Sequence, residues 1–247
     1  MLEVQGLSKE FRGIKAIDDV SFTVPKGSIT SLIGPNGAGK TTLINVVTGV
    51  LPPTRGQLFF DGKSLAGRRP HAVATMGIRR TFQTVRLFTG LTVRENLLIG
   101  RFRNLLERNW MQILCPMRMG DAPGRKRADE VMRMFELEDL ADELATDLPY
   151  GTQRRVEIAR ALVGEPSFVL LDEPAAGMNE QETAQLVQDV LRIREGGVTV
   201  FLVEHDMSMV MSVSDKVVVL NFGSKIAEGT PAEVQRDPEV ITSYLGE

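Results

Sequence analysis

The sequence predicts an α/β fold that carries an antiparallel β element near its start and an inserted helical subdomain. Residues 168–171 form a continuous apolar run, which is typical of a strand buried on both faces of a parallel sheet. Apolar and polar residues alternate within residues 2–24, and apolar residues at helical spacing recur through residues 84–162. We therefore expect a single domain over the whole chain, with residues 1–83 and 163–247 as its α/β core and the helical subdomain between them.

Length and composition place the chain among ordinary globular proteins. It has 247 residues, of which 43% are hydrophobic and 25% charged, and its formal net charge is −3. Nucleic-acid-binding proteins usually present a basic surface, so this charge gives no reason to expect a nucleic-acid partner. The single Cys115 cannot form an internal disulfide, which suits a reducing compartment. The sequence shows neither a signal-peptide pattern nor an apolar stretch of about 18 residues, so we expect any membrane role to come through partners.

The first third of the chain predicts strands and turns. The two alternating runs within residues 2–24 indicate an antiparallel β element, and residues 25–27 form a turn signal. Residues 57–60 have a strand pattern and precede the hairpin signal Asp-Gly at residues 61–62. Residues 65–80 are basic and show no regular pattern, so we expect them to be irregular.

The most specific motif directly follows an apolar, strand-like run at residues 29–33. It is a complete P-loop, G-x-x-x-x-G-K-[ST], in the strand-to-helix context that supports the match. The loop consists of Gly34, Pro35, Asn36, Gly37, Ala38, Gly39, Lys40, Thr41 and Thr42. Its glycines let the backbone direct N–H groups at one point, and the helix that begins near Lys40 adds the positive end of its dipole. Lys40 is placed to reach the β- and γ-phosphates of a nucleoside triphosphate, and the Thr41 hydroxyl is placed to hold Mg²⁺.

Two acidic residues, Asp172 and Glu173, end the apolar run of residues 168–171. Ligands bind at the carboxyl ends of parallel strands, which places both carboxylates near the predicted nucleotide site. Asp172 is placed to support Mg²⁺, and Glu173 to orient or deprotonate the attacking water. The pair therefore predicts hydrolysis of the bound nucleotide.

Helices and strands alternate after the acidic pair. We expect an amphipathic helix over residues 180–194 and strands over residues 198–203 and 216–220. The capping box of residues 230–233, with proline at the first helical position, predicts the start of a short helix.

Two further side chains are candidates for the same site. His205 follows the strand predicted over residues 198–203, where a ligand of the carboxyl end is expected, although a lone histidine is more often a satisfied polar group. Gln83 lies at the entrance to the helical subdomain, where it is placed to touch Mg²⁺ or water and to report the nucleotide state. His71 has no such placement, and we expect it at the surface.

These motifs occur in the order that is typical of one family. The P-loop, Gln83, a signature segment at residues 148–153, the Leu-Asp-Glu-Pro run at residues 171–174 and His205 resemble an ABC-type ATPase over nearly the whole chain. The resemblance implies that two cassettes face each other head to tail. Each ATP, with its Mg²⁺, is then held between the P-loop of one cassette and the signature segment of the other.

The resemblance also implies roles for individual residues. Lys40, Glu173 and His205 match the residues that act on ATP, and Thr41, Gln83 and Asp172 match those that serve Mg²⁺. The residues that match the contact with the partner's ATP are Tyr150, Gly151, Thr152 and Gln153. Phe11 resembles the aromatic residue that stacks on adenine, and a core or edge residue of the first β element is an equally supported interpretation.

The signature segment departs from the usual Leu-Ser-Gly-Gly-Gln. Pro149 replaces the serine, Tyr150 replaces the first glycine, and Thr152 stands where glutamine is common. The lost hydroxyl would have bonded the γ-phosphate across the dimer, and proline also lacks an N–H. Asn179 stands where aspartate is usual after the acidic pair. These departures suggest a heterodimer whose other ATPase carries a fuller signature.

Further details are similar to the ATPases of high-affinity branched-chain amino acid importers. They are the runs at residues 150–160 and 173–179, the last four residues and the long segment between Arg101 and Arg127. This resemblance implies a cytoplasmic subunit, peripheral on the inner face of the cell membrane, that couples ATP-driven cassette dimerisation to movement of transmembrane permease subunits. It also implies a second ABC ATPase subunit and, indirectly, a solute-binding protein.

The long segment allows two interpretations. Its apolar residues, Trp110 among them, fit a helical stripe with arginines beside it. Subdomain core with a solvated basic face is the favoured interpretation, and a surface near the permease or the lipid headgroups is the alternative.

Other functions are compatible with the same motifs. A soluble ABC-type ATPase acting on ribosomes or DNA usually carries two cassettes or a long coiled coil, and this chain has one P-loop and no heptad run. A mainly structural subunit with slow turnover is disfavoured by the intact Glu173. Within the importer interpretation, other amino acids, aromatic acids, amides or urea are alternative cargoes.

Overall fold

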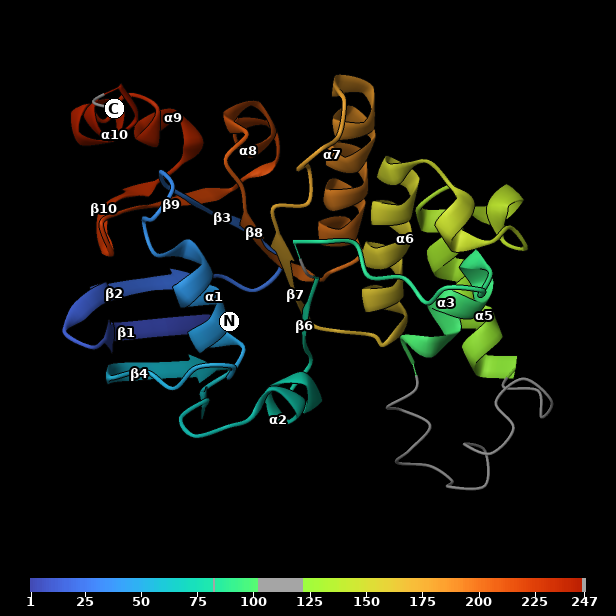
Figure 1. Ribbon diagram of the computed structural model, residues 1–247, viewed down its shortest axis with the longest axis horizontal. Helices are drawn as coiled ribbons and strands as arrows, with labels where there is room; N and C mark the ends of the chain where they lie inside the picture. Colours follow the sequence, from blue (N-terminus) through green and yellow to red (C-terminus); the bar gives the residue numbers. More distant parts are fainter. Residues whose placement is uncertain (82, 102–121, 246–247) are drawn as a thin grey trace.

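The computed structural model of the protein describes residues 1–81, 83–101 and 122–245. In Figure 1 two β-sheets lie toward one end of the molecule, and helices α3 (Val93–Ile99), α5 (Ala122–Met134) and α6 (Tyr150–Val163) lie toward the other. This arrangement confirms the predicted α/β fold with an antiparallel β element and a helical subdomain. Phe82 and most of the predicted insertion, including Trp110, lie outside the described residues, so the two interpretations of that segment stay predictions.

A six-stranded sheet forms the centre of the α/β core. Its strand order is β10-β9-β3-β8-β7-β6, in which every neighbouring pair is parallel except β9 and β10. The strands are β3 (Ile29–Ile33), β6 (Ile78–Arg80), β7 (Phe168–Asp172), β8 (Thr199–Val203), β9 (Lys216–Asn221) and β10 (Ser224–Gly229). Every residue of β3, β7 and β8 is buried, as expected of apolar strands that are covered on both faces.

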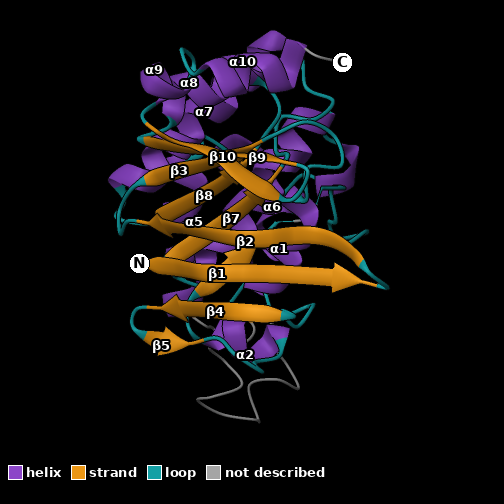
Figure 2. Ribbon diagram, turned by 90° about the vertical axis from the view of Figure 1, so that its left-hand side faces the viewer, coloured by secondary structure: helices purple, strands orange, loops and turns teal. Residues whose placement is uncertain are grey.

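A four-stranded antiparallel sheet contains the first strands of the chain, in the order β2-β1-β4-β5 (Figure 2). Its strands are β1 (Leu2–Phe11), β2 (Ile14–Val24), β4 (Arg55–Phe60) and β5 (Lys63–Ser64). The alternating residues of β1 and β2 bury one face of this sheet, which confirms the predicted β element.

Helix α1 (Lys40–Val47) packs in the hydrophobic core between the two sheets. Leu43, Ile44 and Val47 of this helix belong to the same buried cluster as residues of β1, β2 and β4. The cluster also includes Phe168 and Phe201 of the six-stranded sheet, and the Phe201 ring stacks on a ring of β2 with 5.7 Å between centroids. Helix α1 is therefore packed against both sheets.

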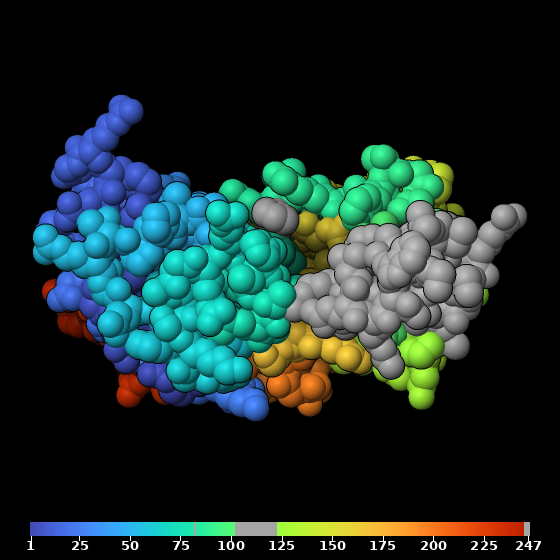
Figure 3. Space-filling model, turned by 90° about the horizontal axis from the view of Figure 1, so that it is seen from below, coloured from blue at the N-terminus to red at the C-terminus, as the bar shows by residue number. Residues whose placement is uncertain are grey.

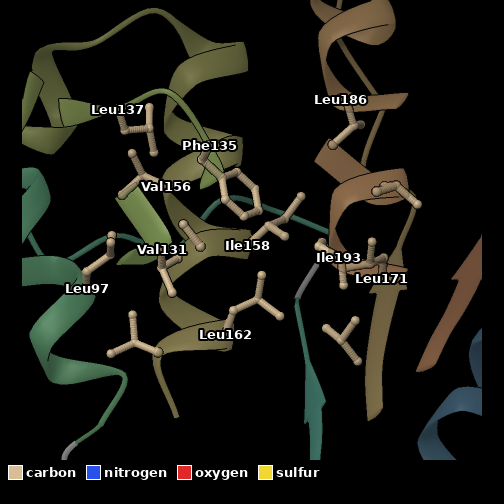
Figure 4. Close-up of a cluster of buried hydrophobic side chains, with 14 of the residues drawn as sticks. Leu97, Val131, Phe135, Leu137, Val156, Ile158, Leu162, Leu171, Leu186 and Ile193 are labelled. Atoms are coloured by element: carbon tan, nitrogen blue, oxygen red, sulfur yellow. The ribbon is translucent and has the colours of Figure 1, made fainter. Parts of the chain in front are cut away.

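The helical subdomain shares a second core with the parallel sheet (Figure 4). Leu97, Val131 and Ile158, from α3, α5 and α6, pack in one cluster with Leu171 of β7 and Ile193 of α7 (Glu180–Glu195). The packing therefore runs without a break from the subdomain to the strand that carries Asp172.

Two helix starts follow the local chemistry of the sequence. The side chains of Thr230 and Glu233 form the predicted capping box at the start of α9 (Pro231–Val234). Asn179 and Glu182 form a second capping box at the start of α7, which has acidic residues in its first turn and basic residues in its last.

The expectation that residues 65–80 are irregular was wrong. They contain α2 (Pro70–Thr75) and β6, the edge strand that pairs with β7. Both elements are too short to produce a periodic pattern, and β6 is defined by its pairing with a strand about ninety residues later. The short elements α8 (Met207–Val213), β10 and α10 (Pro238–Leu245) were also not anticipated.

Seen from below, residues from the N-terminal part and from the helical subdomain lie toward opposite ends of the molecule (Figure 3). In the part of the chain that the structure describes, no helix is long and apolar enough to cross a membrane.

Candidate functional site

The P-loop connects β3 to α1, and its geometry requires glycine at two positions. A Cβ on Gly34 would lie 2.2 Å from the carbonyl oxygen of Leu220, and one on Gly39 would lie 2.4 Å from that of Ala16. Gly39 also has a left-handed backbone, with φ 98°, directly before the first residue of α1. The loop is therefore pressed against neighbouring backbone with no room for side chains at these positions.

Lys40 is buried at the first position of α1. Its Nζ donates hydrogen bonds to the carbonyl oxygens of Gly34, at 2.6 Å, and Pro35, at 3.1 Å. Burial lowers the pKa of Lys40, and the negative charges of Glu173 and Asp172 oppose that shift. The structure thus brings the P-loop lysine close to both predicted carboxylates.

The remaining P-loop residues surround this lysine. Thr41, in the first turn of α1, is exposed, and Thr42 is half-buried. Asn36 and Gly37 are also exposed, whereas Ala38 is buried. The hydroxyl that was predicted to hold a metal ion therefore faces the surface of the protein rather than its core.

The two acidic residues at the end of β7 have different surroundings. Asp172 is buried, and its Oδ2 lies 2.9 Å from Nη2 of Arg80. Glu173 has a left-handed backbone, with φ 45°, and its N–H donates to the carbonyl of Val203 at 2.8 Å. Non-glycine residues in this conformation are strained and are concentrated at functional sites, which supports a functional role for Glu173.

Gln83 meets the Glu173 carboxylate directly. Its Nε2 donates to Oε2 of Glu173 at 2.8 Å, although the two residues are ninety positions apart. The structure therefore gathers Gln83, Lys40 and both acids at one edge of the parallel sheet.

His205 follows β8, the strand between β3 and β7, and so lies at the same edge of the sheet. Its side chain is 59% exposed, and its Nδ1 is 3.6 Å from Oε2 of Glu204. The sequence did not single out Glu204, which is wholly buried and accepts backbone N–H groups from Ala175, His205 and Asp206. Glu204 thereby fixes the loops after β7 and β8. His71 is exposed, as expected.

Arg154 was also missed by the sequence reasoning. Its side chain is wholly buried in α6 and donates to the carbonyls of Gln83 and Glu173 at 2.8 and 3.0 Å. It also pairs with Glu157 at 2.8 Å. Helix α6, which begins at the signature segment, is therefore hydrogen-bonded to the backbone of both Gln83 and Glu173. The sequence offered one signal, the i, i+3 spacing of Arg154 and Glu157 in the helix that follows the signature segment.

The signature residues lie at the start of α6, where Pro149 occupies the N-cap position without a side-chain cap. The Gly151 N–H donates to Oε1 of Glu182 at 3.3 Å. The Gln153 amide donates to two carbonyls in the segment before the helix. Tyr150 is 42% exposed and Thr152 is half-buried. Their bonds to described residues are therefore made within the helical subdomain and to α7.

Phe11 is the last residue of β1 and is 42% exposed. The Nζ of Lys9 lies 5.0 Å from the centre of its ring. An exposed aromatic ring is compatible with stacking on a base, and the adenine contact stays a prediction.

A magnesium site fits the donors at this edge of the sheet. Mg²⁺ is usually bound by one or two carboxylates together with substrate phosphates. The Asp172 carboxylate, the Thr41 hydroxyl and the Gln83 amide are oxygen donors of this kind. Within residues 1–81, 83–101 and 122–245, no cluster of three or more histidine, cysteine or acidic side chains offers a competing metal site.

Comparison with known proteins agrees with this geometry. Residues 17–176 match the family described as ABC transporter, and residues 224–247 match the one described as branched-chain amino acid ATP-binding cassette transporter. The chain is 43% identical over 251 residues to the "High-affinity branched-chain amino acid transport ATP-binding protein BraF" of Pseudomonas aeruginosa, covering 100% of this chain and 98% of that protein. It is 41% identical over 250 residues to the "High-affinity branched-chain amino acid transport ATP-binding protein LivG" of Escherichia coli, with the same coverage.

A solved structure is similar over the full length. It is described as the ADP conformation of an ATP-binding cassette of an ABC transporter, and it matches with a TM-score of 0.87 and 34% identity. The match covers 100% of this chain and 99% of that one.

Proposed function

The chain belongs to the family of ABC transporter ATP-binding subunits, and on this premise we propose that it is the ATP-hydrolysing motor of an importer for branched-chain amino acids. The observation that carries the proposal is the convergence of Lys40, Gln83, Asp172 and Glu173 beside a complete P-loop. The names of the relatives BraF and LivG support the cargo.

The P-loop holds the phosphates of ATP. The backbone N–H groups of residues 34–42 and the dipole of α1 bind the anionic oxygens. When ATP binds, Lys40 replaces its hydrogen bonds to the carbonyls of Gly34 and Pro35 with hydrogen bonds to phosphate oxygens. Its buried ammonium therefore keeps hydrogen-bond partners. Phe11 stacks on the adenine. Thr41, Asp172 and Gln83 would hold Mg²⁺, which supplies positive charge against the phosphate oxygens.

Glu173 then acts on water. Its carboxylate accepts a proton as the water oxygen attacks the γ-phosphorus in line, and the bond from that phosphorus to the β–γ bridging oxygen breaks to release ADP and phosphate. Gln83 orients the carboxylate through its hydrogen bond. His205 contacts the γ-phosphate from the end of β8.

The site and the family support a proposal about the partners. The signature residues of this chain serve the ATP of a second, different ATPase, and transmembrane permease subunits dock on the pair at the cytoplasmic face of the membrane. A solute-binding protein delivers the cargo to the permeases. A homodimer of this chain that hydrolyses ATP at the rate of a cassette with an intact signature would contradict the heterodimer.

Uptake of labelled leucine tests the cargo. Cells that lack this chain are complemented with the wild type, with Lys40→Ala or with Glu180→Gln, a control at an exposed position in the first turn of α7. We expect the wild type and the control to restore high-affinity uptake and Lys40→Ala to fail. Uptake that is independent of the chain, or that is competed by urea or amides and not by valine or isoleucine, would contradict the proposed cargo.

A further inference from the structure

Arg80 lies where the nucleotide site meets the edge of the sheet. It is the last residue of β6, and its Nη2 is 2.9 Å from Oδ2 of Asp172. Its Nη1 donates to Oδ1 of Asn45 at 2.7 Å and lies 3.4 Å from Oγ1 of Thr48. The side chains of Arg80 and Asp172 are only 15% and 8% exposed, so solvent screens this pair little.

These contacts join the two elements that supply the predicted metal donors. Asn45 follows Thr41 by four residues in α1, so both side chains lie on the same face of the helix. Arg80 therefore bridges the helix that carries the Thr41 hydroxyl and the strand end that carries the Asp172 carboxylate. The planar guanidinium is suited to this bridge, because its donors have fixed directions and one group can reach two acceptors.

We propose that Arg80 is a positioning residue for the divalent cation of the nucleotide site, an inference that rests on the proposed ATPase function. The guanidinium holds one oxygen of Asp172 and leaves the other available to the cation. Through Asn45 it also sets the position of α1 relative to the carboxylate. Hydrogen-bonded partners of metal ligands act in this way, and their loss weakens metal binding by about 10- to 100-fold.

The neighbouring arginine provides a matched control. Arg79 precedes Arg80 in the same strand, and its side chain points to the opposite face of the sheet. Its Nη1 donates to the carbonyl of Ala74 at 2.9 Å, in α2. Replacing Arg79 therefore removes the same charge from the same strand and leaves the Asp172 contact in place.

The experiment measures nucleotide binding by the full chain, with and without metal. A fluorescent ATP analogue is titrated into the wild type, Arg80→Gln, Arg80→Lys and Arg79→Gln, first in EDTA and then with increasing Mg²⁺. We expect all four proteins to bind the metal-free nucleotide within about twofold of each other, because the P-loop is unchanged. The quantity compared is the Mg²⁺ concentration that gives half of the maximal Mg²⁺-dependent increase in nucleotide binding. We expect it to rise by about tenfold or more in both Arg80 variants and to stay at the wild-type value in Arg79→Gln.

Other outcomes would overturn the inference. An unchanged Mg²⁺ requirement in Arg80→Lys and Arg80→Gln would make Arg80 a structural residue, and a lower requirement would make it a competitor of the cation. If Arg80→Gln fails to fold, Arg80→Lys decides, because it keeps the charge and loses the two-acceptor geometry. Transport is not measured, so a failed uptake experiment leaves this result standing. A wild type that binds no nucleotide would refute the proposed function instead.

Discussion

Glu173 combines a strained backbone with a direct partner, Gln83, at the entrance to the helical subdomain. Its left-handed conformation costs about 1–3 kcal/mol and persists because β8 and Arg154 bond to its backbone on either side. The strain directs a carboxylate toward Gln83 at the carboxyl end of β7. The role of Glu173 as a base can therefore be tested separately from its role in the fold.

We predict that Glu173→Gln retains ATP binding and loses turnover. Glutamine keeps the size of the side chain and removes the base, so the rate should fall by about 100-fold or more. ATP hydrolysis and nucleotide binding are measured side by side, with Glu180→Gln as a control outside the site. Turnover at the wild-type rate would remove Glu173 from the mechanism.

Tyr244 is half-buried near the P-loop, and its hydroxyl oxygen is buried. It packs against a small core that includes Ile33 and Val240, and its hydroxyl is shielded from solvent close to the backbone of Gly34. Burial raises the pKa of Tyr244 to about 12, and the nearby backbone of Gly34 opposes the shift.

Tyr244→Phe should therefore change the stability of the protein at high pH. An unfolded tyrosine ionises near pH 10 and the native Tyr244 only near pH 12, so the wild type has its full stability below pH 10 and loses it as the pH rises toward 12. Phenylalanine does not ionise, so the variant does not lose stability in this way between pH 10 and pH 12. Free energies of unfolding are compared from pH 8 to pH 12, and an identical pH dependence in the two proteins would refute the assignment.

At the scale of elements, the sequence predicted the strands, loops and helix starts that have a clear local pattern. The buried strands β3 and β7, the P-loop and the capping box of α9 each depend on a few consecutive residues, and the structure has all of them. The edge strand β6 escaped because three residues have no period, and only pairing with β7 defines it. Elements of this size are set by tertiary contacts.

The same reason explains which site residues were missed. Arg80 and Arg154 act through partners that are distant in the sequence, namely Asp172 and the backbone of Gln83. Arg80 belongs to none of the motifs, and Arg154 lies in the run of residues 150–160 that was used only for the family resemblance, so the sequence did not reveal the buried partners of either arginine. Glu204 adjoins the predicted His205 and was missed because its partners are backbone N–H groups of two separate loops. Sequence motifs identify the side chains that are predicted to touch the substrate. The residues that hold those side chains in place are identified only in the folded structure.

The start of α6 provides the prediction at this scale. Pro149 has no side-chain oxygen to cap the helix or to reach the partner's γ-phosphate. Pro149→Ser supplies one, and a hydrogen bond to a charged group contributes about 1.5–3 kcal/mol, which corresponds to a rate increase of roughly 10- to 150-fold. We expect that rise in the ATPase rate of the assembled transporter and no change in the isolated chain. If the assembled transporters with the wild-type chain and with Pro149→Ser hydrolyse ATP at the same rate, the residue at position 149 does not limit hydrolysis.

For the whole molecule, one continuous core connects the nucleotide site to the helical subdomain. The cluster of Figure 4 extends from α3 to β7, and Arg154 bonds α6 to the backbone beside Gln83 and Glu173. A change at the γ-phosphate that moves Gln83 therefore acts directly on the packing of α6. If the proposed permease subunits dock on this subdomain, they would receive that movement.

On the proposed function, the chain works as one ATPase of a heteromeric importer. We would purify the tagged chain from gently solubilised membranes and identify its partners by mass spectrometry. We predict two polytopic permeases and a second ATPase with an intact Leu-Ser-Gly-Gly signature. Recovery only from the soluble fraction, with ribosomal or DNA-associated partners, would contradict the transport function and leave the ATPase assignment alone.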